Sequence, residues 1–235
     1  MTDTSLLQPQ YWQLVAEFFP PRLGGEPEAW TQANKVVAPE VWRRLLARLE
    51  AWDASTGNVR RDWDLYYADW LDSMCHEVGV EGPTRAEAST RLALEAEAWI
   101  RSRARAIFSD VLPALTRLAG TFTLFTASDG MSDQLASWLG QSDLAVLFKG
   151  LYGPDLVNTP KQLEAYYPRI FEHAGIEPVS ALVVDDSPAA LARARKAGAR
   201  TVLVAPSATS SDAFDAVIPR LADLPALLEA GLGRN

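Results

Sequence analysis

The second half of the chain alternates short β-rich runs with helical segments, and this alternation constrains the fold more than any other feature. The β-rich runs are residues 121–126, 144–150, 181–185, 201–205 and 215–218. Strand, helix and strand at this spacing predict right-handed βαβ crossovers and a parallel sheet that helices cover on both faces. The sequence therefore predicts an α/β fold built on a doubly wound parallel sheet.

The first half of the chain has a different pattern. From about residue 12 to 118, apolar residues recur three to four positions apart, which predicts amphipathic helices. Seven of the eight tryptophans lie in this half. We expect them mainly to pack between helices, although one or two could face a pocket.

Composition narrows the class of partner and compartment. A net charge of -8 argues against a nucleic acid or an anionic membrane as the main partner, because either requires a concentrated basic face. Cys75 is the one cysteine, so no internal disulfide forms, and a reducing cytoplasm fits. The sequence shows no long apolar run and no signal-peptide pattern, which also predicts a cytoplasmic protein.

Two adjacent aspartates, Asp185 and Asp186, follow the apolar run that ends at Val184. In a parallel sheet, ligands bind beyond the carboxyl ends of the strands. Two ionised carboxylates at such an edge repel each other unless a cation compensates, and Mg²⁺ is held by one or two carboxylates together with water. Both aspartates are therefore candidate Mg²⁺ ligands. The alternative makes them acidic caps of the helix that starts at Ser187.

Two further segments point to an anion at the same edge. Thr126, Ala127 and Ser128 end the first strand, where a hydroxyl and unpaired N–H groups at a helix start suit a phosphate. Lys161 is predicted in the first turn of its own helix, which Asn158 or Thr159 caps. A cation is unfavourable there, so an anion nearby explains it. A solvated surface lysine is the alternative.

Together these segments resemble the haloacid dehalogenase (HAD) superfamily of hydrolases. Thr126 in "TLFTAS" is similar to the family's second motif, Lys161 in "NTPKQLEAYYPRIF" to its third, and "VVDDSPAALARARKAGA" to its fourth. The resemblance covers about residues 108 to 230, with one departure: here Pro160 precedes the lysine, whereas the family usually has proline after it.

The resemblance implies a Rossmann-like core with an inserted α-helical cap. Core residues would be 1–11 and 91–235, and the cap 12–90. Caps close over small substrates and exclude water.

The family's first motif supplies an aspartate nucleophile and a second aspartate that acts as acid and base. Its best match is "MTDTSL", which aligns Asp3 with the acid/base residue and Met1 with the nucleophile. Three explanations stay open: the natural chain starts upstream, Asp3 is itself the nucleophile in a shifted register, or the protein is non-catalytic. The first is favoured, because the other motifs are intact.

The resemblance also implies an activity. The leading hypothesis is a Mg²⁺-dependent phosphatase that acts on a small phosphorylated metabolite through an aspartyl-phosphate. Asp3 and Lys161 would be catalytic. Thr126, Ala127, Ser128 and Lys161 would bind the phosphate, and Asp185 and Asp186 the metal. The alternatives are a metal-independent 2-haloacid dehalogenase and a non-catalytic binding or scaffold protein on the same fold.

Overall fold

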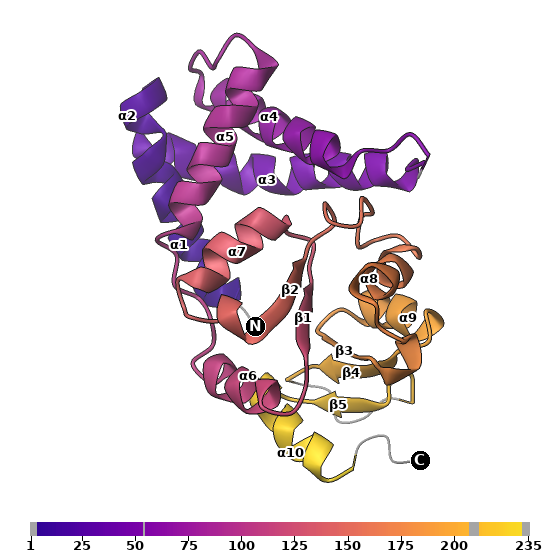
Figure 1. The fold of residues 1–235 in the computed structure, drawn as a ribbon. Helices are drawn as coiled ribbons and strands as arrows, with labels where there is room; N and C mark the ends of the chain where they lie inside the picture. The colour runs from indigo at the N-terminus through magenta and orange to yellow at the C-terminus, as the bar shows by residue number, and fades with distance from the viewer. Residues whose placement is uncertain (1–3, 54, 207–211, 232–235) are drawn as a thin grey trace. The chain divides into compact units, whose positions relative to one another are not determined.

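The computed structural model describes residues 4–53, 55–206 and 212–231. The chain divides into two compact units, with the division between Ile107 and Phe108. A helical unit precedes this point and an α/β unit follows it (Figure 1). No helix of the described ranges is both long and apolar enough to cross a membrane.

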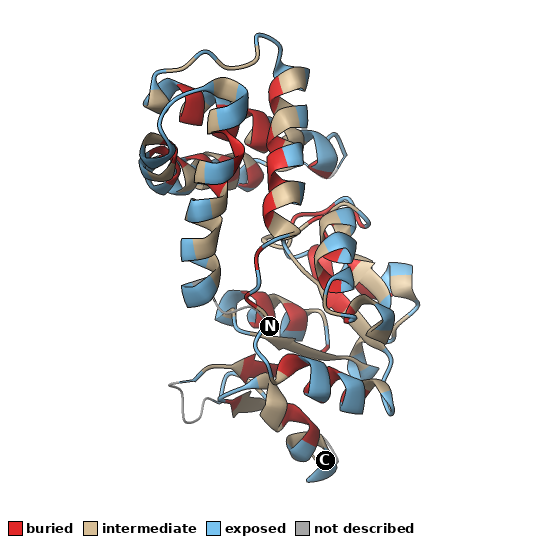
Figure 2. Cartoon of the chain, turned by 90° about the vertical axis from the view of Figure 1, so that its left-hand side faces the viewer, coloured by how far each residue is buried: buried red, intermediate tan, exposed pale blue. Residues whose placement is uncertain are grey.

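The helical unit confirms the amphipathic pattern of the first half. Its helices are α1 (Thr4–Phe18), α2 (Pro20–Leu23), α3 (Pro27–Glu50), α4 (Val59–Val78) and α5 (Ala86–Arg101). Helix α4 packs against both α3 and α5, and α1 packs against the same two helices. Buried and exposed residues alternate along these helices, as a helix with one apolar face requires (Figure 2).

Tryptophans of the helical unit pack in its core. Trp30 is fully buried and stacks on Phe19 with ring centroids 4.7 Å apart. The indole N–H of Trp30 donates to the Gly24 carbonyl at 2.8 Å, and that of Trp70 donates to Asn34 Oδ1 at 2.9 Å. Burying an indole is favourable when its N–H finds an acceptor, so these two side chains act as packing residues.

The α/β unit contains the predicted parallel strands. They are β1 (Leu124–Ala127), β2 (Phe148–Tyr152), β3 (Leu182–Asp185), β4 (Arg200–Val204) and β5 (Ala216–Ile218). Every pairing among them is parallel, which confirms the α/β fold. Strand β1 pairs with β2, and β3 pairs with β4, which pairs with β5. Within the described residues the strands thus form two sheets, and no strand pairs with the second edge of β1 or β3.

Helices flank these strands. They are α6 (Val111–Ala119), α7 (Ser132–Gly140), α8 (Tyr166–Ala174), α9 (Pro188–Lys196) and α10 (Leu224–Glu229). Helix α9 packs on β3 and β4, α7 packs on β2, and α6 packs on α10. Single 3-10 turns cover Ala145–Leu147, Pro178–Ser180 and Leu221–Asp223.

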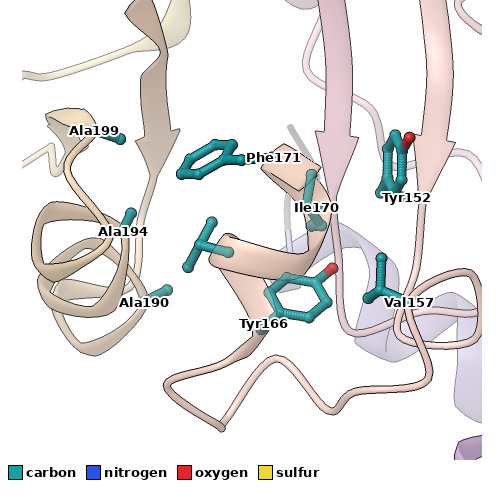
Figure 3. Packing of buried hydrophobic residues seen from close by; sticks show 9 residues of the cluster. Tyr152, Val157, Tyr166, Ile170, Phe171, Ala190, Ala194 and Ala199 are labelled. Atoms are coloured by element: carbon teal, nitrogen blue, oxygen red, sulfur yellow. The ribbon is translucent and has the colours of Figure 1, made fainter. Parts of the chain in front are cut away.

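An apolar cluster around α8 joins the two sheets. Figure 3 shows Tyr166, Ile170 and Phe171 of α8 beside alanines of α9. Partly buried Phe125 of β1 and Val183 of β3 pack against the same cluster. Because residues of both sheets contact one helix, α8 holds the ends of β1 and β3 in a common core.

The division between the two units, after Ile107, differs from the predicted one. The sequence analysis gave residues 12–90 to the cap, and residues 1–11 and 91–235 to the core. Helix α1 already begins at Thr4, and α5 continues to Arg101. The cause is the apolar face of α5, where Ala96 and Ile100 are fully buried and the helix packs on α4 and α1. Residues 91–107 therefore fold with the helical unit.

The helix predicted around Lys161 also begins later. Residues 159 and 160 have no regular structure, residues 161–165 form turns and a bend, and α8 starts at Tyr166. Asn158 has φ 42°, the left-handed region that turns the chain before this segment. Lys161 is therefore not in a first helical turn, and the argument from the helix dipole for an anion beside it was wrong.

Candidate functional site

Lys161 lies where the carboxyl ends of two strands meet. Its ammonium Nζ is 3.0 Å from the carbonyl oxygen of Ala127, the last residue of β1, and 2.7 Å from Asp185 Oδ2, at the end of β3. Both side chains of the ion pair are only 11% exposed. One lysine thus links strands that belong to separate sheets, and three residues that the sequence singled out come together.

The two adjacent aspartates have different surroundings. Asp185 is fully engaged, because its Oδ1 accepts the backbone N–H of Ser187 at 2.8 Å while Oδ2 accepts from Lys161. Asp186 is exposed, and in the described part of the chain no hydrogen bond or ion pair engages its carboxylate. The side chain that caps α9 is Ser187, whose Oγ accepts the N–H of Ala190 at 3.3 Å. Asp186 is therefore the carboxylate left available to a cation.

The segment from Thr126 to Ser128 is less open to an anion than the sequence predicted. Thr126 is buried, and its hydroxyl donates to the carbonyl of Tyr152 at 3.2 Å. The N–H of Ser128 donates to the same carbonyl at 3.1 Å, and the N–H of Gly130 donates to Ser128 Oγ at 3.1 Å. We expected these donors to be free for a phosphate. Instead, the Tyr152 carbonyl of strand β2 already accepts hydrogen bonds from two of them, the Thr126 hydroxyl and the Ser128 N–H.

The start of α7 is capped by a carboxylate. Asp155 accepts the backbone N–H of Ser132 at 2.9 Å and also its hydroxyl. The approach is close, since a Cβ added at Gly153 would fall 2.2 Å from the Gly130 carbonyl oxygen. A negative side chain already satisfies this helix end, so the expectation of unpaired N–H groups there was wrong for Ser132.

Sequence analysis missed a third carboxylate at this edge. Asp129 Oδ1 accepts from the Gln162 side-chain amide at 2.9 Å. Asp129 is exposed as a residue, but neighbouring protein atoms partly desolvate its carboxylate, which raises the pKa of Asp129; this effect exceeds the opposing effect of the Lys161 charge. The rule about strand ends could have found this residue, because it lies three positions after Thr126.

Tyr167 was also missed. It is 1% exposed, and its hydroxyl has no hydrogen-bond partner among the described residues. Burial, followed by the negative charge of Asp185, raises the pKa of Tyr167 well above its usual value. No sequence signal distinguished it from an ordinary core aromatic of α8.

The remaining predicted site residue, Asp3, lies outside the described residues, so its role stays a prediction. Within the described ranges, no group of three or more His, Cys, Asp or Glu side chains is arranged to hold a metal ion. The oxygen donors of Asp186 nevertheless suit Mg²⁺, which keeps several waters and needs only one or two carboxylates.

No family model and no curated protein matches this sequence. Solved structures do resemble the chain. The HAD-hydrolase YfnB from Bacillus subtilis, bound to magnesium, is 17% identical with a TM-score of 0.68 over 97% of this chain and 93% of that one. L-2-haloacid dehalogenase from Xanthobacter autotrophicus is 17% identical with a TM-score of 0.63, over 98% and 95% of the two chains.

A third structure, the 2-haloacid dehalogenase from Pseudomonas syringae pv. Tomato DC3000, is 21% identical with a TM-score of 0.63, over 98% and 94% of the two chains. These likenesses agree across nearly the whole chain. The protein has the fold of the HAD-type hydrolases, as the motif resemblance implied.

Proposed function

We propose that the protein is a hydrolase of small anionic substrates, and that its leading activity is Mg²⁺-dependent hydrolysis of a phosphate ester in the cytoplasm. The observation that carries this proposal is that the two adjacent aspartates at the end of β3, Asp185 and Asp186, differ in their contacts. Lys161 and Ser187 engage Asp185, whereas Asp186 is exposed beside them without a partner in the described part of the chain. A free carboxylate next to a fixed cation suits a metal and an anionic substrate together.

Each site residue has a role within this proposal. Asp186 would be the direct Mg²⁺ ligand, and Asp185 would hold the lysine in place. When bound, the metal would supply positive charge to a phosphoryl oxygen. Lys161 would orient and neutralise the anionic substrate from the β1 side, where it is already fixed by the Ala127 carbonyl. Asp3 remains the proposed catalytic carboxylate of the aspartyl-phosphate route.

Thr126 and Ser128 would contribute to phosphate binding only after exchanging hydrogen bonds that they now make to Tyr152. We therefore give them a secondary role. The helical unit would act as the cap, and its tryptophans Trp30 and Trp70 would support the unit by packing rather than by contacting substrate.

A second candidate is metal-independent hydrolysis of a 2-haloacid. One observation favours it: Lys161 neutralises Asp185 at 2.7 Å, so the edge carries less negative charge to repel a carboxylate substrate than two free aspartates would. The solved dehalogenases that share the fold agree with this candidate.

The test is a pair of assays on the full-length protein. Phosphate release from a panel of phosphorylated metabolites is measured with Mg²⁺ and with a chelator, and halide release from 2-chloropropionate is measured with the chelator. We expect phosphatase activity that the chelator and Asp186→Asn abolish. Glu164→Gln is the matched control, because it removes an exposed carboxylate whose ion pair with Lys196 is 3.2 Å long.

Phosphate release that persists in chelator, or in Asp186→Asn, would refute the metal role. Halide release in chelator would support the second candidate. No turnover in either assay would favour a non-catalytic binding protein, which is the reading from a different functional class.

A further inference from the structure

Strand β1 pairs with another strand along one of its edges only. In a parallel ladder, the peptide groups of successive residues point alternately to the two edges of a strand. The N–H of Ser128 donates to the Tyr152 carbonyl of β2 at 3.1 Å. Phe125 and Ala127 therefore direct their peptide groups to the other edge of β1, with which no strand of the described residues pairs. We call it the open edge of β1.

Strand β3 has an open edge of the same kind. The N–H of Arg200, the first residue of β4, donates to the carbonyl of Ala181 at 3.0 Å. By the same alternation, Leu182 and Val184 direct their peptide groups away from β4. In the described part of the chain no strand pairs with this second edge, which is the open edge of β3.

The two open edges are neighbours. Lys161 Nζ contacts the Ala127 carbonyl, which belongs to the open edge of β1, at 3.0 Å and Asp185 Oδ2, at the end of β3, at 2.7 Å. Helix α8 packs against residues of both strands, and Figure 3 shows it between Tyr152 of β2 and the alanines of α9. One lysine thus joins the carboxyl ends of the two strands, and one helix covers both.

Solvent reaches both strands. All four residues of β3 are half-buried, although three of them are leucine or valine. In β4, which has a strand on each side, the three middle residues are buried. Strand β1 likewise buries only Thr126. The open edges are therefore accessible and are not covered by the described parts of the chain.

The open edges also lack the features that protect ordinary sheet edges. Natural edge strands avoid further pairing by carrying lysine or proline, or by being very short. Strand β2 has exposed Lys149, and β5 has three residues and is followed by Pro219. Residues 124–127 and 182–184 contain no proline and no charge. Strands β1 and β3 thus have the composition of strands that pair on both sides.

We propose that the open edges of β1 and β3 bind one extended segment of a partner polypeptide, which lies between the two strands and hydrogen-bonds to both. Its core would be about five residues long, the usual length of a strand, to match the four residues of β1 and of β3. Valine and isoleucine would dominate it, because a strand with neighbours on both sides is covered on both faces. This site does not depend on the reaction proposed above.

The test uses a synthetic peptide whose core alternates valine and isoleucine between lysines that keep it in solution. Backbone amide exchange of the intact, ¹⁵N-labelled protein is followed residue by residue with NMR, with and without the peptide. In the free protein, the open-edge N–H groups should exchange faster than those of Thr126 and Val183, which face β2 and β4. Saturating peptide should slow exchange of the open-edge groups of both strands by about tenfold or more.

A second peptide decides whether both open edges are occupied. It has the same sequence with methyl groups on alternate backbone nitrogens, so it can pair along only one of its edges. A segment that lies between β1 and β3 needs both of its edges, and we therefore expect the methylated peptide to leave exchange unchanged. Protection of one strand alone by this peptide would reduce the site to a single edge and overturn the proposal.

Two proline variants test the site from the side of the protein. Val184→Pro removes an N–H group from the open edge of β3 without breaking a bond to β4, and it should weaken binding of the unmethylated peptide by about tenfold or more. Leu151→Pro is the matched control and should bind as the wild type does, because the Leu151 peptide group points to the edge of β2 away from β1.

Open-edge N–H groups that exchange at the same rate with and without the unmethylated peptide would overturn the proposal. So would equal binding by Val184→Pro and the wild type. If Val184→Pro does not fold, the methylated peptide on the wild-type protein supplies the deciding comparison. Slow exchange of the open-edge groups without peptide, strengthening with protein concentration, would place a second copy of this chain there and overturn the assignment to a partner polypeptide.

Discussion

Replacing Asp185 by asparagine is expected to lower the free energy of unfolding of the α/β unit by about 3 kcal/mol. At the Nζ–Oδ2 distance of 2.7 Å, and an effective dielectric constant of about 20, the attraction between Lys161 and Asp185 is about 6 kcal/mol. Desolvation of the two charges offsets part of this, because each side chain is only 11% exposed. Asp185→Asn removes the attraction and leaves the Lys161 charge buried.

Lys161→Met should cost a similar amount for the opposite reason, since within the described ranges the Asp185 carboxylate then keeps only the Ser187 N–H as a partner. The double variant Lys161→Met/Asp185→Asn leaves no buried charge behind. Its loss of stability should therefore be little more than that of either single variant, which corresponds to a coupling energy of about 2–3 kcal/mol.

The assay is urea unfolding followed by far-UV circular dichroism, with the slope against urea checked for constancy across variants. Seven of the eight tryptophans lie in the helical half, so their fluorescence follows that unit and serves as an internal reference. Single variants whose effects simply add, with a coupling energy below about 0.5 kcal/mol, would refute a buried ion pair that links β1 to β3. The exposed pair Lys196–Glu164 is the control, and Glu164→Gln should cost less than about 1 kcal/mol.

Three further predictions concern single residues. Gly153→Ala should destabilise the α/β unit by about 2–3 kcal/mol in thermal melts, because its Cβ would meet the Gly130 carbonyl at 2.2 Å. Its control Gly140→Ala, with nothing within 4 Å, should be neutral or up to about 1 kcal/mol stabilising; equal effects would contradict the packing. Ser187→Ala should cost about 1 kcal/mol in urea unfolding through the lost cap of α9, and no loss would show that the cap is dispensable. Burial raises the pKa of Cys75 to about 11, so iodoacetamide labelling should be slow at pH 8 and accelerate towards pH 10; labelling at the rate of a free thiol would contradict this.

Local sequence signals predicted the elements that position the site. The run 181–185 became β3 (Leu182–Asp185) because β-branched and apolar residues favour a strand, although all four residues of β3 are only half-buried. Ser187 followed by Pro188 started α9 as predicted, since both the cap and the fixed φ of proline act within one turn. These predictions held because neighbouring residues alone determine them.

The start of α8 and the state of the anion site were not predictable in the same way. Residues 161–165 carry helix-compatible side chains, yet they form turns and a bend in which Lys161 contacts the ends of β1 and β3. The cap of α7 comes from Asp155, 23 residues after Ser132. A local pattern cannot reveal that a carboxylate so far along the chain has already taken the N–H group expected to be free.

The sequence by itself determined the parallel α/β unit and its helical partner, because hydrophobic periodicity and strand direction are properties of short segments. Only the tertiary structure decided that Asp185 forms an ion pair with Lys161 while Asp186 stays exposed. It also showed that Nε and Nη2 of Arg48 and Nε1 of Trp52 are buried without an acceptor among the residues that the structure describes. Such differences depend on which atoms meet across distant parts of the chain, and hydrogen bonding and charge compensation are satisfied in space rather than along the sequence.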